Sequence, residues 1–201
     1  MNDDLEARLR RIYAAIGETQ EPDVSKFPAT VIANEKGILI HQDFSGGRTE
    51  EQLANAIQSL IALIAGLEYH LYKWADKNGH DVEKVKLPLQ ASKLFSIVHD
   101  LWNNEKHGYS PGRGSHKSGL APQLINVIRV MKLATQPTPG SSVVFMVGPG
   151  GKPVIGGNGT ATAVITGDVV GKDGQRIGDA HEILEGAVKD CEKLLRDLGI
   201  S

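Results

Sequence analysis

A short polar stretch at the end of a predicted helix carries the residue types that could do chemistry. Asp100, Asn103 and His107 follow one another at spacings of three and four, which places them on one side of a helix. A histidine can act as a general acid or base near neutral pH, and Asn or Asp can fix its tautomer or orient a hydroxyl. We therefore take Asp100, Asn103 and His107 as the candidate catalytic residues.

Basic residues lie within this stretch and after it, although the whole chain has a formal net charge of -2. Lys106 lies inside the stretch, and the glycine-rich segment that follows contains Arg113 and Lys117. Cationic side chains bind phosphate groups and neutralise the charge that develops during phosphoryl chemistry. We predict that Lys106, Arg113 and Lys117 bind phosphate. The stretch also has a structural interpretation, in which Lys106 and His107 oppose the helix dipole while Asp100 and Asn103 face water.

Two further polar residues lie on the long helix that precedes this stretch. Glu68 and His70 are two positions apart, so their side chains point in different directions. Either one could reach the Asp100 site if the two helices pack together. We interpret His70 as a partly exposed packing residue. The histidines are dispersed and form no metal-binding motif, so we predict neither a metal site nor another cofactor.

The residues Trp102-Asn-Asn-Glu-Lys-His107 resemble the signature of the HEPN superfamily of helical nucleic-acid-acting domains. That signature is an Arg, commonly followed by Asn, Asp or His, with a His four to six positions beyond the Arg. Asn103 and His107 match it, whereas Trp102 stands at the Arg position, so no residue carries over for the catalytic arginine. The resemblance implies metal-independent RNA cleavage or RNA binding, usually by a dimer, in a bacterial defence or toxin–antitoxin system.

A second resemblance covers more of the chain. Helices with the pattern Asp-x-x-Asn-x-x-Lys-His occur in uncharacterised bacterial proteins that also end with strands and a closing helix. This chain is similar to them over roughly residues 49 to 198.

The spacing of apolar residues predicts the helices that position this site. Helices are expected over residues 3–17, 49–77, roughly 88–106, and 179–198. Thr49-Glu-Glu-Gln52 has the pattern of a capping box, and Pro88 is expected in the first turn of its helix. The second and third helices are predicted to form an antiparallel pair.

Strand patterns flank these helices on both sides. A β-hairpin is predicted over residues 30–41, and strands are predicted over 124–133, 142–147 and 160–166, the first of which also fits a helix. The glycine-rich segment 148–159 lacks the helix that must follow a phosphate-binding loop, so we interpret it as one or two β-turns. The segment 171–174 is another predicted turn.

The predicted fold class is α+β, with an N-terminal helix and hairpin, a helix pair, and a C-terminal antiparallel sheet covered by a C-terminal helix. The corresponding regions are residues 1–48, 49–120 (the HEPN-like region) and 121–201, packed as one unit. Cys191 is the single cysteine, and no apolar run is long enough for a membrane span. These features favour a cytoplasmic protein without membrane contact.

Three functions remain open from the sequence. The preferred one is an RNA-acting or RNA-binding protein that forms a homodimer, with His107 as acid or base and Asn103 and Asp100 orienting it. The second is a non-catalytic binding or scaffold protein that uses the basic loop 106–117. The third is a structural homodimer built on the helix pair.

Overall fold

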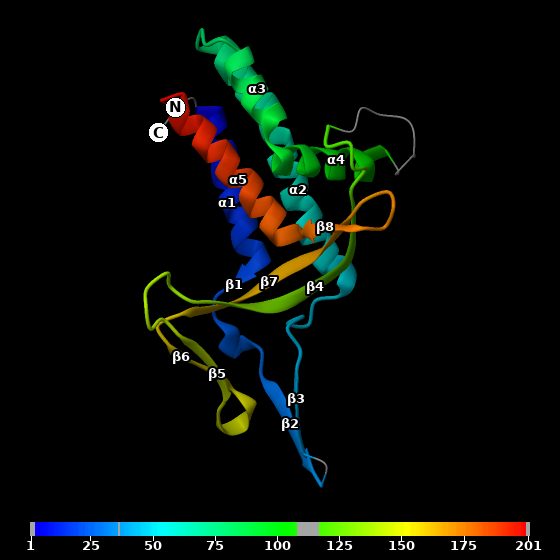
Figure 1. Ribbon diagram of the computed structural model, residues 1–201, viewed down its shortest axis with the longest axis vertical. Helices are drawn as coiled ribbons and strands as arrows, with labels where there is room; N and C mark the ends of the chain where they lie inside the picture. The colour runs from blue at the N-terminus through cyan, green and yellow to red at the C-terminus, as the bar shows by residue number, and fades with distance from the viewer. Residues whose placement is uncertain (1–2, 36, 108–116, 200–201) are drawn as a thin grey trace.

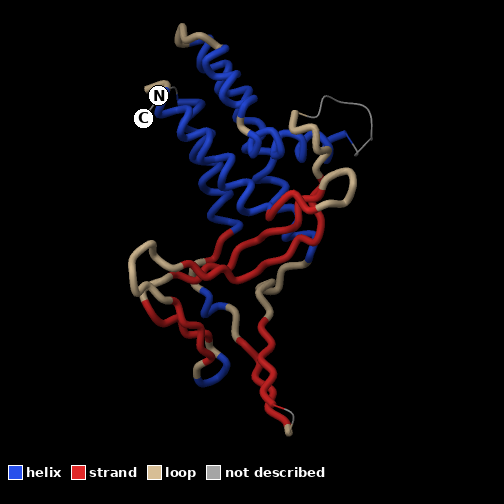
Figure 2. The backbone as a smooth tube through the Cα atoms, in the orientation of Figure 1, coloured by secondary structure: helices blue, strands red, loops and turns tan. Residues whose placement is uncertain are grey.

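The computed structural model describes residues 3–35, 37–107 and 117–199, and it confirms the α+β fold class (Figure 1). Its helices are α1 (Asp3–Thr19), α2 (Glu50–Lys77), α3 (Glu83–Ala91), α4 (Lys93–His107) and α5 (Ala180–Asp197). Figure 2 shows these helices on one side of a central antiparallel sheet and two hairpins on the other side. The helices and the sheet together enclose the main hydrophobic core, to which all five helices, β4 and β7 contribute buried residues.

The central sheet contains four strands: β1 (Gln20–Glu21), β4 (Gln123–Ala134), β7 (Thr160–Val170) and β8 (Arg176–Asp179). Its order is β1-β7-β4, and β8 also pairs with β7. The helical alternative for residues 124–133 is therefore wrong, because this segment pairs along almost its whole length with β7. A bulge interrupts the register between Ile125 and Ile128, and Asn126 there has a positive φ of 53°.

Two separate hairpins extend from the sheet. β2 (Ala29–Asn34) pairs with β3 (Gly37–Gln42), which confirms the predicted hairpin, and a short 3₁₀ turn, Val24–Lys26, precedes it. β5 (Val143–Val147) pairs with β6 (Pro153–Gly157). The predicted strand over 142–147 is therefore not part of the central sheet. The turn at Pro149–Gly151 folds β5 back onto β6, and β1 and β8 join β7 instead.

The long helix α2 begins and ends where the sequence predicts. The Thr49 hydroxyl accepts a hydrogen bond from the backbone N–H of Gln52 at 3.3 Å, and the Gln52 side chain accepts one from the Thr49 N–H at 3.0 Å. This reciprocal pair is the predicted capping box. The helix buries the expected apolar stripe of Leu53, Ile57, Leu60, Ile64, Leu67, Leu71 and Trp74.

The predicted helix over 88–106 is two helices, α3 and α4, separated at Ser92. Ser92 has an extended backbone, and its hydroxyl accepts a hydrogen bond from the N–H of Phe95 at 3.0 Å, which starts a new helix. Pro88 lies inside α3, not in its first turn, and α3 ends at Ala91. α3 and α4 run in different directions, so the expected simple antiparallel pair is not formed (Figure 1).

The hairpin β2–β3 exposes apolar side chains, among them the cross-strand pair Val31 and Ile40, which are 48% and 50% exposed. The double substitution Val31→Thr plus Ile40→Thr is therefore expected to lower the free energy of unfolding by no more than about 1 kcal/mol. Urea denaturation of both proteins at equal concentration measures this difference. A loss of several kcal/mol would contradict the exposed position of the hairpin.

Candidate functional site

Helix α4 carries the polar residues of the site, and its other side chains fix it in the core. Phe95, Val98 and Leu101 are buried. The Ser92 hydroxyl that starts the helix also donates to the carboxylate of Asp190 on α5 at 2.5 Å. The direction of α4 is thus set by contacts with the core and with α5, and its polar residues have defined positions.

Asp100 is completely buried and anchors the segment that begins at Lys117. Its carboxylate accepts hydrogen bonds from the backbone N–H groups of Lys117 at 2.8 Å and Ser118 at 2.7 Å, and from the Ser118 hydroxyl at 2.6 Å. Burial by itself would raise the pKa of this carboxyl, but the hydrogen bonds and neighbouring His99 lower it. Asp100 is therefore neither a solvated residue nor one whose carboxylate is open to a ligand.

His99 lies at the centre of the polar cluster. Its Nδ1 is 3.5 Å from Oδ1 of Asp100 and 3.3 Å from Nδ2 of Asn103, and its Nε2 is 3.7 Å from Oε2 of Glu68. The His99 side chain is 14% exposed. Carboxylate oxygens thus lie near both ring nitrogens, and the Asn103 amide helps to hold the ring in place. This arrangement holds the His99 ring in a fixed orientation.

Glu68 connects α2 to this cluster. Nζ of Lys117 lies 2.6 Å from both carboxylate oxygens of Glu68, and the Tyr72 hydroxyl donates to Oε1 at 2.5 Å. Burial would raise the pKa of Glu68, but the hydrogen bonds from Lys117 and Tyr72 lower it. Burial and the Glu68 carboxylate also raise the pKa of Tyr72. The sequence-based expectation that Glu68 could reach the Asp100 site is thus confirmed, and His70 is partly exposed, as predicted.

The six residues predicted from sequence have different environments. Asn103 is half-buried beside His99, whereas His107 is exposed in the last turn of α4. Lys106 lies over the ring of Trp102, with its Nζ 5.1 Å from the ring centroid. Lys117 is paired with Glu68, and Arg113 lies outside the described residues. Asp100 contacts His99, not His107, so it cannot be assigned the predicted role of orienting His107.

His99 is the site residue that sequence reasoning missed. It directly precedes Asp100 and lies four positions before Asn103. Residues 99, 103 and 107 therefore follow one another at intervals of four along α4, a spacing that keeps them on neighbouring parts of one helix surface. We define the polar face of α4 as His99, Asn103, Lys106 and His107.

The described residues contain no group of three or more His, Cys, Asp or Glu side chains that could hold a metal ion. Cys191 is buried, and burial raises the pKa of its thiol to about 12. Within residues 3–35, 37–107 and 117–199, no helix combines the length and the apolar character needed to cross a membrane.

No protein family, curated protein or solved structure matches this chain. The resemblance to HEPN domains therefore stays a prediction from residues 102–107.

The lowered pKa values of Glu68 and Asp100 predict how stability depends on pH. Their ordinary values, 4.5 and 3.8, apply to the unfolded chain, and the folded values are lower. The two carboxylates therefore contribute stability that is present above about pH 5 and is lost as the pH falls through the folded pKa values. We expect the free energy of unfolding to decrease between about pH 5 and pH 3.

The variant Glu68→Gln isolates one of these two contributions. It cannot ionise, so its free energy of unfolding should be lower than that of the wild type at pH 7 and should decrease less as the pH falls. Urea denaturation at a series of pH values measures both properties. Identical pH dependence of variant and wild type would contradict the role of Glu68.

Proposed function

We propose that this protein is a HEPN-like RNA-binding protein that cleaves RNA at the polar face of α4, with His99 as the general acid and base. The observation that carries the proposal is the fixed orientation of His99 between Glu68, Asp100 and Asn103. In the same proposal the protein acts in the cytoplasm as a homodimer, as expected for a HEPN-like protein of a bacterial defence or toxin–antitoxin system.

The chemistry uses a nucleophile that RNA itself provides. His99 takes the proton of a ribose 2′-hydroxyl, and the 2′-oxygen attacks the adjacent phosphorus. The bond from phosphorus to the 5′-oxygen breaks, the protonated His99 returns a proton to that oxygen, and a 2′,3′-cyclic phosphate remains. Asp100 and Glu68 are positioning residues, because their carboxylates lie beside the two ring nitrogens of His99 and hold the ring.

The rest of the polar face suits binding of a single-stranded RNA. Lys106 and His107 are exposed near the end of α4 and can contact phosphates. The Trp102 ring is half-buried beside Lys106 and His99, and aromatic rings of this kind stack with unpaired bases. These residues lie on one helix with His99, so one strand could contact all of them.

A comparison of RNA with DNA tests the proposal. Single-stranded RNA and DNA oligonucleotides of the same sequence are incubated with the wild-type protein in the presence of EDTA. We expect cleavage of the RNA to a 2′,3′-cyclic phosphate and no cleavage of the DNA, because the DNA has no 2′-hydroxyl. Cleavage of both oligonucleotides, cleavage of neither, or no binding of RNA would contradict the proposal.

One observation favours the binding function without catalysis. Lys117 bonds to Glu68 through its Nζ and to Asp100 through its backbone N–H. With the further contacts of these carboxylates to His99 and Ser118, the cluster could be purely structural. In that case RNA binding should survive the substitution His107→Ala and should be lost in Lys106→Glu plus Arg113→Glu. Binding is measured by fluorescence anisotropy with a labelled RNA.

A further inference from the structure

A cavity of about 660 Å³ lies away from the polar face of α4, where the end of β3 and the connector to α2 meet the bulged part of β4. Its volume is in the range of small-molecule binding sites. The charged and aromatic side chains that line it are those of His41, Asp43, Phe44, Arg48, Glu50 and Arg129. Two arginines that share a cavity suggest an anionic ligand.

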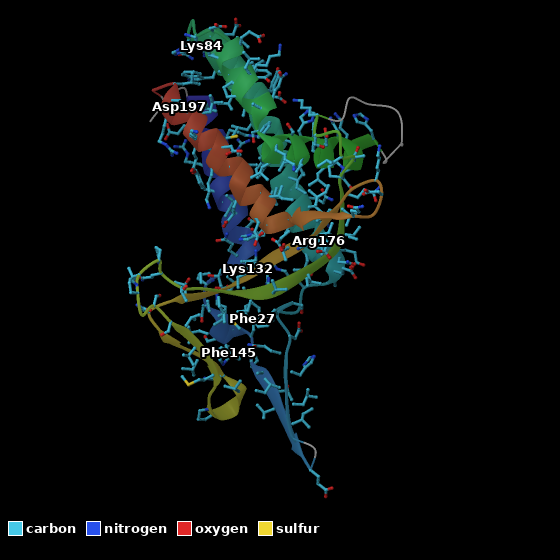
Figure 3. All side chains as sticks on the ribbon, viewed as in Figure 1. Phe27, Lys84, Lys132, Phe145, Arg176 and Asp197 are labelled. Atoms are coloured by element: carbon cyan, nitrogen blue, oxygen red, sulfur yellow. The ribbon has the colours of Figure 1, made fainter. Side chains whose placement is uncertain are left out.

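Arg129 has an incomplete set of partners in the folded chain. Its Nε is buried and has no hydrogen-bond partner, and its Nη1 donates only a long bond of 3.4 Å to the carbonyl of Ser45. The guanidinium lies 5.6 Å from the ring centroid of Phe27, and Figure 3 shows Phe27 on the hairpin side of the sheet. Burial, and next the charge of Arg48, lower the pKa of Arg129, and Glu21 opposes this effect. An anion in the cavity would accept hydrogen bonds from the guanidinium N–H groups that the long bond to Ser45 leaves without an acceptor.

The acidic residues of the cavity do not neutralise the two arginines. Asp43 accepts hydrogen bonds from the backbone N–H of Ser45 at 2.7 Å and from its hydroxyl at 2.9 Å, which lower the pKa of Asp43. Glu50 lies in the first turn of α2. Neither Arg48 nor Arg129 forms an ion pair with a carboxylate among the residues that the structure describes.

The backbone at the cavity has features of a built site. Asn126 adopts a positive φ of 53° within the bulge of β4, a conformation that residues other than glycine rarely adopt. Bulges change the direction of a strand and are frequent next to binding sites. Gly46, with a φ of 62°, comes close to the Arg129 guanidinium, because a side chain at this position would lie 3.3 Å from its Nη1.

We propose that this cavity binds the phosphate group of a small phosphorylated molecule through Arg48 and Arg129. The planar guanidinium presents two parallel N–H groups to phosphate oxygens, which favours phosphate over a neutral ligand. Phe44 and Leu53, which also line the cavity, provide apolar surface for the remainder of the ligand. This site does not depend on the RNA-cleaving function of α4, because none of its residues belongs to the polar face.

Calorimetric titration of the full chain with ADP, inorganic phosphate and adenosine tests the proposal. We expect ADP to bind, adenosine to bind at least about tenfold more weakly, and Arg129→Gln and Arg48→Gln each to weaken ADP binding about tenfold or more. The matched control is Arg11→Gln, which changes an exposed arginine on α1 and should leave ADP binding unchanged.

Circular dichroism checks that Arg129→Gln remains folded, and the exposed Arg48 provides a second variant if it does not. Absence of binding by both ADP and phosphate at millimolar concentration overturns the proposal, as does ADP binding that neither substitution weakens. The proposal is also overturned if the protein binds an RNA oligonucleotide but neither ADP nor phosphate, and if Arg48→Gln abolishes that RNA binding. The RNA-cleaving proposal is judged separately, from cleavage by the same variants.

Discussion

Replacing Asp100 by alanine is expected to lower the free energy of unfolding by about 3 kcal/mol at pH 7. The carboxylate is fully buried, and its loss leaves the N–H groups of Lys117 and Ser118 without their acceptor. Asp100→Asn keeps the shape and one carbonyl oxygen, so its loss should be smaller. Urea denaturation of the three proteins measures this order of stability.

Asp76→Ala is the matched control for Asp100→Ala. Asp76 lies on α2 and is exposed, so its replacement should change the free energy of unfolding by no more than about 0.5 kcal/mol. If Asp100→Ala and Asp76→Ala have equally small effects, Asp100 does not anchor the segment after Lys117 in the way described.

Replacing His99 by alanine is expected to lower the rate of RNA cleavage about 100-fold or more, since positioned acids and bases typically contribute that much. The affinity for RNA should change little, because Lys106, His107 and Trp102 remain. A gel assay with end-labelled RNA measures the rate, and fluorescence anisotropy measures the affinity.

His80→Ala is the control for a general effect of removing a histidine. His80 follows α2, is exposed and stacks on Trp74, away from the polar cluster. The His80→Ala variant should cleave RNA at the wild-type rate. If His99→Ala also cleaves at the wild-type rate, His99 is not the acid and base.

Local signals in the sequence were sufficient for much of the fold. The capping box at Thr49 and Gln52, the apolar stripe of α2 and the helix α5 depend on residues a few positions apart, and all were predicted. The break at Ser92 was not predicted, because it depends on a serine that both caps α4 and contacts Asp190, 98 positions away. The separate hairpin β5–β6 was not predicted, because the pairing of strands depends on tertiary contacts that local sequence does not show.

The site was located correctly in part. The spacing of Asp100, Asn103 and His107 predicted one side of a helix, but it could not show which end of that side is buried. Asp100 faces the core because residues 117 and 118, which follow in the chain, fold back onto it. His99 was missed because its importance comes from Glu68 on another helix, and such a contact is not visible in local spacing.

Histidine resonances give the most direct test that RNA binds the polar face of α4. The protein, with its histidines ¹³C-labelled, is titrated with a single-stranded RNA whose 2′-hydroxyls are methylated to prevent cleavage. We expect the ring signals of His99 and His107 to shift, while those of exposed His80 and buried His181 remain unchanged. RNA binding that leaves the signals of His99 and His107 unchanged would contradict binding at the polar face of α4.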